Sequence, residues 1–255
     1  MTSFARSGIF CKGREERMEN MKTVIAIPCM ETVQTEFVRS LVNMRYVGEV
    51  QFIFTECSLV YQARTALCGM AMEAKADYVL WLDSDVVFQP DLMEKLMEDI
   101  QGKDMVTAVY HGRRAPFRPV IYKTITPGLL PMNIKVEQYN EYPMDGLFEI
   151  EGCGFGAVLM KTGVIREVAE TFHQTFGPIP GLGEDLSFCV RARSCGYKIW
   201  CDPQLQIGHK GSMVIDGNTF RAYWGRMAEK TRGEGNGSGK HDADGGEAGA
   251  ERDGE

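Results

Sequence analysis

The sequence lacks an apolar run long enough to cross a membrane. No window of its 255 residues approaches the ~20 predominantly apolar residues of a transmembrane helix, and the N-terminus has no long apolar segment like that of a signal peptide. The sequence therefore predicts a soluble, cytoplasmic protein with no transmembrane segment.

Positive charge is not in excess either, because the formal net charge is -7. A general nucleic-acid binder needs a basic face that displaces counterions from phosphates, so nucleic acid is not expected as a partner. Residues 229–255 hold eight acidic and four basic residues, which accounts for four of the seven net negative charges. The remaining chain is only mildly acidic and can still form a local basic pocket for one diphosphate.

There is no CxxC pair among the eight cysteines, and no zinc-knuckle spacing. A free thiol in an apolar segment acts as a small hydrophobic side chain. Reduced, structural cysteines are therefore expected, and five of them lie in or beside apolar segments: Cys29, Cys57, Cys68, Cys153 and Cys189.

Composition divides the chain into three parts. Residues 1–20 are charged and aperiodic, which predicts a disordered lead or an over-extended start upstream of Met21. Residues 229–255 are rich in glycine and charge, a composition that cannot bury enough apolar surface to offset chain entropy, and are expected to be disordered. The folded domain is expected at residues 21–228.

Apolar runs typical of buried strands alternate with helical spacings in the first half of this domain. This order predicts an α/β fold, with a Rossmann-like, mostly parallel sheet flanked by helices. Less regular patterns after residue 120 predict a smaller mixed region, and a helix over 184–195 that ends at Gly196. The segments expected as strands in the first half are 23–28, 50–55, 77–82 and 103–110, and those expected as helices are 34–46, 61–75 and the stretch from Pro90 to Gly102.

Two carboxylates follow the third expected strand, at Asp83 and Asp85. In extended geometry, side chains two residues apart point to the same side, so both carboxylates are predicted to face one ion. Hard oxygen ligands suit Mg²⁺ or Mn²⁺, which also accept diphosphate oxygens. A solvated turn with Asp83 as a helix cap is the alternative reading, because a bare DxD triplet is common by chance.

Residues 61–92 (YQARTALCGMAMEAKADYVLWLDSDVVFQPDL) resemble the central stretch of family 2-type GT-A glycosyltransferases. The resemblance implies a GT-A fold, a nucleotide-diphospho-sugar donor, and a metal that bridges the diphosphate, with Asp85 as the principal ligand. It places Asp83 on the ribose or on the metal through water, with Ser84 between them in the donor site. It also places Arg64 near the base or phosphates, and a solvated helix cation is the alternative for Arg64.

Gly183–Cys189 (GEDLSFC) resembles the ED motif of the same family. The resemblance favours Asp185 as the general base that deprotonates the acceptor hydroxyl, with Glu184 orienting the acceptor; a plain helix cap is the alternative. Residues 183–211, which end in GHKG, resemble the closing segment of the family. This resemblance implies His209 as a further metal ligand and Lys210 as a counter-charge for the diphosphate. By the same comparison, Pro28 and Glu31 lie where the family holds the nucleobase and ribose.

The sequence does not decide the roles of two further loops. Residues 151–157 (EGCGFGA) lack the Lys-Ser/Thr of a phosphate-binding P-loop, and are expected as a close-packed turn beside the donor sugar and acceptor. The basic loop around Arg113, Arg114 and Arg118 is either solvated or part of a phosphate or acceptor wall.

The expected activity is therefore metal-dependent transfer of a sugar, of hexosyltransferase type, from a nucleotide donor to an acceptor hydroxyl, with inversion favoured. The acceptor, whether glycan, lipid-linked or protein, is not readable from motifs. The alternatives are a retaining transferase and a non-catalytic sugar-nucleotide or glycan-binding module on the same fold. A sugar-1-phosphate nucleotidyltransferase is disfavoured, because the first strand–helix turn lacks a Gly-rich, basic phosphate loop.

Overall fold

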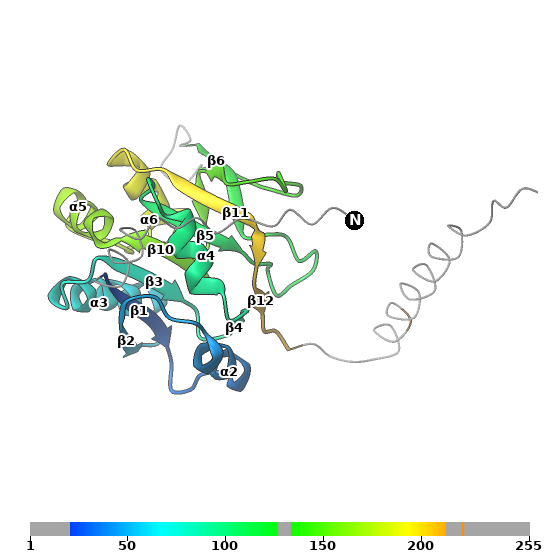
Figure 1. Ribbon diagram of the computed structural model, residues 1–255. Coiled ribbons are helices and arrows are strands. Elements are labelled where there is room, and N and C mark those ends of the chain that lie inside the picture. Colours follow the sequence, from blue (N-terminus) through cyan, green and yellow to red (C-terminus); the bar gives the residue numbers. More distant parts are fainter. Residues whose placement is uncertain (1–20, 127–133, 213–220, 222–255) are drawn as a thin grey trace, which may run out of the picture. The chain divides into compact units, whose positions relative to one another are not determined.

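The computed structural model describes residues 21–126, 134–212 and 221 (Figure 1). The chain divides into two units, Met1–Lys210 and Gly211–Glu255. All the strands and helices described below lie in the first unit. The predicted disordered segments, 1–20 and 229–255, lie outside the described residues.

A seven-stranded sheet forms the centre of the domain, in the order β2-β1-β3-β10-β5-β11-β8 (Figure 1). Five strands run parallel to one another, whereas β10 and β8 run antiparallel to their neighbours. The predicted mostly parallel sheet is confirmed, but the insertion of β10 between β3 and β5 was not expected. The strands are β1 (Lys22–Cys29), β2 (Glu49–Glu56), β3 (Tyr78–Leu82), β5 (Met105–Val109), β8 (Phe148–Ile150), β10 (Ala157–Lys161) and β11 (Ile199–Gln206).

Helices cover both faces of this sheet, which explains why its central strands read as continuous apolar runs. In β3, Val79 and Trp81 pack into one core cluster while Leu80 and Leu82 pack into the other, and all four are fully buried. The first cluster includes residues of α3 (Val60–Glu73), α5 (Thr162–Phe172) and α6 (Glu184–Ser194). The second includes residues of α2 (Thr35–Asn43) and α4 (Leu92–Asp99).

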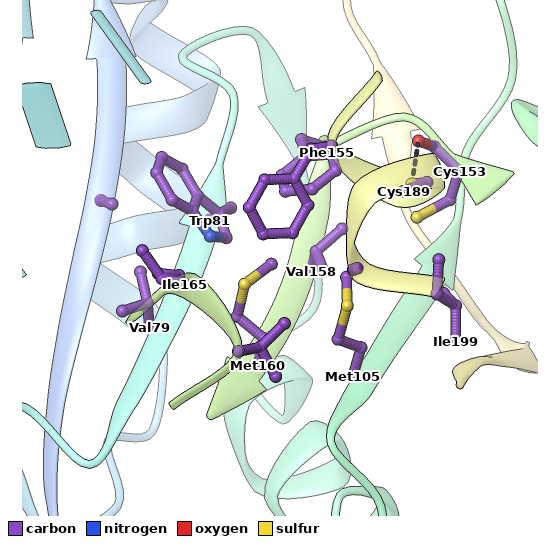
Figure 2. Packing of buried hydrophobic residues seen from close by; sticks show 14 of the residues in the cluster. Val79, Trp81, Met105, Cys153, Phe155, Val158, Met160, Ile165, Cys189 and Ile199 are labelled. Atoms are coloured by element: carbon purple, nitrogen blue, oxygen red, sulfur yellow. Dashed lines mark hydrogen bonds between the residues drawn. The ribbon is translucent and has the colours of Figure 1, made fainter. Parts of the chain in front are cut away.

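Aromatic rings pack together within the first cluster, and Figure 2 shows two of them, Trp81 and Phe155, among aliphatic and sulfur-containing side chains. Trp81 makes edge contacts with Phe155 and Phe176, with ring centroids 5.9 and 5.1 Å apart, and Phe176 stacks on Phe188 at 4.6 Å. The seven cysteines among the described residues are free thiols, as predicted, and Cys153 and Cys189 lie within this cluster (Figure 2). The site described below is therefore bordered on one side by a well-packed apolar core.

Two small sheets complete the domain. One consists of β6 (Ile121–Thr126), β7 (Lys135–Gln138) and β9 (Gly152–Cys153), and corresponds to the predicted mixed region. The other pairs β4 (Val86–Val87) with β12 (Gly208–His209), in a register that places His209 opposite Val86. Helix α6 is followed by Gly196 at a φ of 89°, as expected from the sequence. None of the described helices has the length and apolar character needed to traverse a bilayer.

Candidate active site

The DSD turn begins directly after the buried strand β3. The Asp83 N–H donates to the carbonyl of Gly156 at 3.3 Å, so the turn is tied to the glycine-rich segment before β10. Residues 84 and 85 form a turn rather than extended backbone. The predicted extended geometry is therefore wrong, and the two carboxylates contact different partners.

Arg64, from the first turns of α3, connects the DSD turn with the ED motif. Its Nη2 lies 2.9 Å from Asp83 Oδ1 and 3.3 Å from Asp185 Oδ1, and its Nε lies 3.8 Å from Glu184 Oε1. The Arg64 side chain is only 2% exposed, which excludes a solvated helix cation. One buried guanidinium thus holds three carboxylates from two motifs that lie far apart in the sequence.

The guanidinium of Arg64 also lies over two aromatic rings, 5.2 Å from the centroid of Phe155 and 5.7 Å from that of Phe176. Its Nε and Nη1 are buried without a hydrogen-bond partner among the described residues. Burial lowers the pKa of Arg64, but Asp185, Asp83 and Glu184 outweigh it and raise the pKa above its ordinary value. Arg64 therefore stays charged, held between carboxylates and ring faces.

Asp185 and Glu184 open helix α6, at the end where the helix dipole favours carboxylates. Burial raises the pKa of Asp185 to about 7, and the negative charges of Glu184 and Asp83 add to this rise while Arg64 opposes it. Asp185 Oδ1 is buried with no hydrogen-bond partner among the described residues. Asp185 is thus a carboxyl group that exchanges its proton near neutral pH, as a general base requires.

Asp85 turns away from Arg64 towards two other cations. Its Oδ1 lies 3.4 Å from His209 Nε2, and its Oδ2 lies 2.6 Å from Arg113 Nη1. Burial raises the pKa of Asp85, but His209 and Arg113 outweigh it and bring the pKa below its ordinary value. Asp85 is therefore held as a carboxylate.

The His209 ring is oriented by the backbone of a neighbouring loop, because its Nδ1 lies 3.0 Å from the carbonyl oxygen of His111. A carbonyl can only accept, so Nδ1 carries a proton. The hydrogen bond with Asp85 raises the pKa of His209 and favours a second proton on Nε2, which a metal would replace to take the Nε2 lone pair. A backbone carbonyl on one ring nitrogen is the usual support of a metal-binding histidine. The donor set of Asp85 and His209 therefore fits a divalent cation, although within the described ranges no three His, Cys, Asp or Glu side chains converge as a metal site.

One protein-family model matches part of the chain. Residues 37–160 match the sequence model of the family described as "Glycosyl transferase family 2". The chain is a glycosyltransferase, and just under half of it, residues 37–160, is similar to family 2 of these enzymes. No curated protein sequence matches the chain significantly.

Two solved structures show that this glycosyltransferase has the GT-A fold. A197 from STIV is 20% identical, with a TM-score of 0.54 over 75% of this chain and 87% of that one. GalNAc-T7, solved with UDP, GalNAc and Mn²⁺, is 13% identical, with a TM-score of 0.52 over 87% of this chain. The present chain spans about half of the length of GalNAc-T7, 52% of that chain. At these low sequence identities, the likeness to the two structures shows a shared fold alone.

The other predicted donor-site residues lie around this centre. Pro28 is buried within β1, and Glu31 is exposed just beyond its end. The carbonyl of Ser84 accepts from the Gln34 N–H at 3.2 Å, which ties the DSD turn to the start of α2. Lys210 donates its backbone N–H to the Asp85 carbonyl at 2.8 Å, while its ammonium group pairs with Glu36. In this structure, therefore, the Lys210 side chain contacts Glu36, and only the Lys210 backbone contacts Asp85.

Tyr110 is a site residue that the sequence analysis missed. It follows β5 at the same edge of the sheet as the DSD turn, and its ring meets His209 edge-on with centroids 5.2 Å apart. Burial raises the pKa of Tyr110 well above its ordinary value, with further contributions from Asp83 and Asp185. A Cβ atom on Gly154 would lie 1.9 Å from the Tyr110 hydroxyl oxygen, so this glycine makes room for the tyrosine. The position of Tyr110 after an apolar strand was the available signal.

Proposed function

We propose that this glycosyltransferase transfers a sugar from a nucleotide-diphosphate donor to an acceptor hydroxyl, with a divalent metal on Asp85 and His209 and with Asp185 as the base. The observation that carries the proposal is the separation of the site into two centres. Asp85 is kept ionised beside His209, whereas Asp185 has a pKa raised to about 7. One carboxylate suits a cation, and the other suits proton transfer near neutral pH.

The chemistry assigned to these residues is an inverting displacement. The acceptor oxygen forms a bond to the anomeric carbon while the bond from that carbon to the diphosphate breaks, and the hydroxyl proton passes to Asp185. The metal, when bound, neutralises charge on the departing nucleoside diphosphate. Arg64 keeps Asp185 and Asp83 in place from below, and Glu184 orients the acceptor.

The structure of GalNAc-T7 contains the same classes of ligand, since it was solved with a divalent metal, a nucleoside diphosphate and a sugar. That likeness concerns a protein only 13% identical, so it supports the class of donor and not the identity of the sugar or nucleotide. Mn²⁺ and Mg²⁺ both suit one carboxylate and one imidazole, completed by diphosphate oxygens and water.

The test measures release of nucleoside diphosphate from a panel of nucleotide sugars with Mn²⁺, Mg²⁺ or EDTA. Asp85→Ala is expected to remove metal-dependent donor binding, whereas Asp185→Asn is expected to retain binding and lose transfer. Asp104→Asn is the matched control, because Asp104 pairs with Lys161 just before β5, at the opposite end of that strand from Tyr110. Equal loss of donor binding in the Asp85 and Asp185 variants would contradict the division of roles, and full activity in EDTA would contradict the metal.

A further inference from the structure

A basic loop, defined here as residues 111–119, lies between β5 and β6 and reaches Asp85. Its two ends are held together, since the Gly112 N–H donates to the carbonyl of Arg118 at 2.9 Å and His111 forms a bridge with Pro119. The His111 carbonyl also accepts the bond from His209. The loop is therefore anchored to the same histidine that faces Asp85, and from it the Arg113 side chain reaches Asp85.

The two cations on Asp85 differ in how firmly they are held. The His209 side chain is 14% exposed and is oriented by a backbone carbonyl, whereas the Arg113 side chain is 52% exposed. An exposed ion pair is weak, because water solvates both charges and the side chain must be ordered to form it. Arg113 is thus the partner that a competing cation displaces, and His209 is the partner that stays.

We propose that Arg113 is a movable counter-charge, which occupies Asp85 in the absence of donor and turns to the donor's diphosphate when a metal takes Asp85. The inference rests on the proposed function. A guanidinium and a divalent cation compete for the same carboxylate, and they repel each other at close range. A diphosphate relieves the competition, because its oxygens accept the paired N–H groups of arginine.

Such an arrangement makes the binding of metal and nucleotide mutually dependent. Metal alone has to displace Arg113 into solvent next to a new positive charge, whereas metal with a diphosphate gives Arg113 a new partner. By linkage, the nucleotide tightens the metal by the same factor by which the metal tightens the nucleotide. Arg113 therefore discourages the site from filling with a metal when no donor is present.

The experiment measures two affinities of the full-length protein: Mn²⁺ alone, by electron paramagnetic resonance of the free ion, and UDP, GDP, CDP, ADP and dTDP with saturating Mn²⁺, by calorimetry. Arg113→Ala is expected to bind Mn²⁺ alone about five-fold more tightly, because one exposed competitor has gone. The same variant is expected to bind the preferred nucleoside diphosphate at least about ten-fold more weakly. An effect of opposite sign on the two ligands is not produced by a merely structural defect.

Arg114→Ala is the matched control, because it removes the same charge from the next position of the loop, where the side chain is exposed. It is expected to change both affinities by less than about two-fold. Arg113→Lys keeps a competing cation but loses the planar fork, so it is expected to bind Mn²⁺ like the wild type and the diphosphate with intermediate affinity.

The inference is overturned if Arg113→Ala binds Mn²⁺ no more tightly than Arg114→Ala, or if it binds the nucleoside diphosphate as tightly as the wild type. Failure of the proposed function looks different: the wild type then binds none of the five nucleoside diphosphates in the presence of Mn²⁺. That result also removes the diphosphate half of the inference, while the Mn²⁺ measurement still decides whether Arg113 competes for Asp85.

Discussion

Replacing Arg64 with methionine tests whether one buried guanidinium holds the two acidic motifs together. Methionine retains packing against Phe155 and Phe176 but removes the charge that faces Asp83, Glu184 and Asp185. Removing one partner of a buried ion pair costs about 3–5 kcal/mol. The three carboxylate side chains are 20–23% exposed, so water recovers part of that cost. The expected loss at pH 8 is therefore about 3 kcal/mol, or roughly 6–12 °C in Tm for a domain of this size.

The pH dependence separates this charge effect from a packing effect. Arg64 favours the ionised carboxylates, so its contribution is present at high pH and fades as the pH falls and the carboxylates bind protons. Because the pKa of Asp185 is about 7, the loss in Arg64→Met is expected to shrink to about half between pH 8 and pH 5. Thermal and urea unfolding at both pH values, in EDTA, measure the loss.

Arg191→Met is the matched control. Arg191 is 3% exposed and donates through Nη1 to the carbonyl of Thr175 at 2.8 Å, so its partner does not titrate. Its replacement should destabilise the protein to the same extent at pH 5 and pH 8. A loss in Arg64→Met that is equally independent of pH, or that stays below about 1 kcal/mol at pH 8, would refute the assigned role of Arg64.

Two further predictions concern single residues of the site. Burial raises the folded-state pKa of Asp185 to about 7, above the roughly 3.9 of a free aspartate, so this group stabilises the fold only at low pH and the contribution is lost as the pH rises towards 7. The free energy of unfolding of Asp185→Asn, relative to that of the wild type, is therefore expected to rise by about 2 kcal/mol between pH 5 and pH 8. The difference in Tm between the two proteins should widen by roughly 4–8 °C over this range, and a constant difference would contradict the raised pKa of Asp185. Gly154→Ala places a Cβ 1.9 Å from the Tyr110 hydroxyl oxygen and should cost about 1–3 kcal/mol in urea unfolding together with most of the donor binding. Gly163→Ala in α5, where a Cβ meets no atom within 4 Å, should instead leave donor binding intact and stabilise the fold by up to about 1 kcal/mol. Equal behaviour of the two glycine variants would contradict the placement of Tyr110, which packs on His209, in the donor site.

The sequence predicted the first half of the fold well, because apolar runs and helical spacings there are uninterrupted. It did not predict α5, β4 or β7, or that β10 lies antiparallel between β3 and β5. An apolar run such as that of β10 specifies burial on both faces, but it carries no information on strand direction or on neighbours.

The same limit applies to the site. Asp83, Asp85, Asp185 and His209 were all recognisable from motifs at the ends of elements, and the structure brings them to neighbouring positions. The sequence did not show which side chains pair with one another. Asp83 pairs with Arg64 and Asp85 with His209 because residues 84–85 form a turn. Tyr110 and Arg113 belong to the site through tertiary contacts. The position of Tyr110 after a buried strand was the only signal for it, whereas Arg113 was noticed as part of a basic loop whose role the sequence left open.

The antiparallel strand β10 also governs the order in which the domain can fold. Its residues pair with β3 on one side and β5 on the other, so Val158 lies opposite both Trp81 and Thr107. Until residue 161 has left the ribosome, β3 and β5 have no partner between them, and each presents an open edge that is prone to pairing with other chains. Closing the sheet over this sequence distance is an entropically slow step. The acidic turn after β3, whose Asp83 N–H bonds to the Gly156 carbonyl just before β10, thus cannot reach its final geometry before β10 is in place. A truncated chain without β10 would retain the DSD triplet without the site around it.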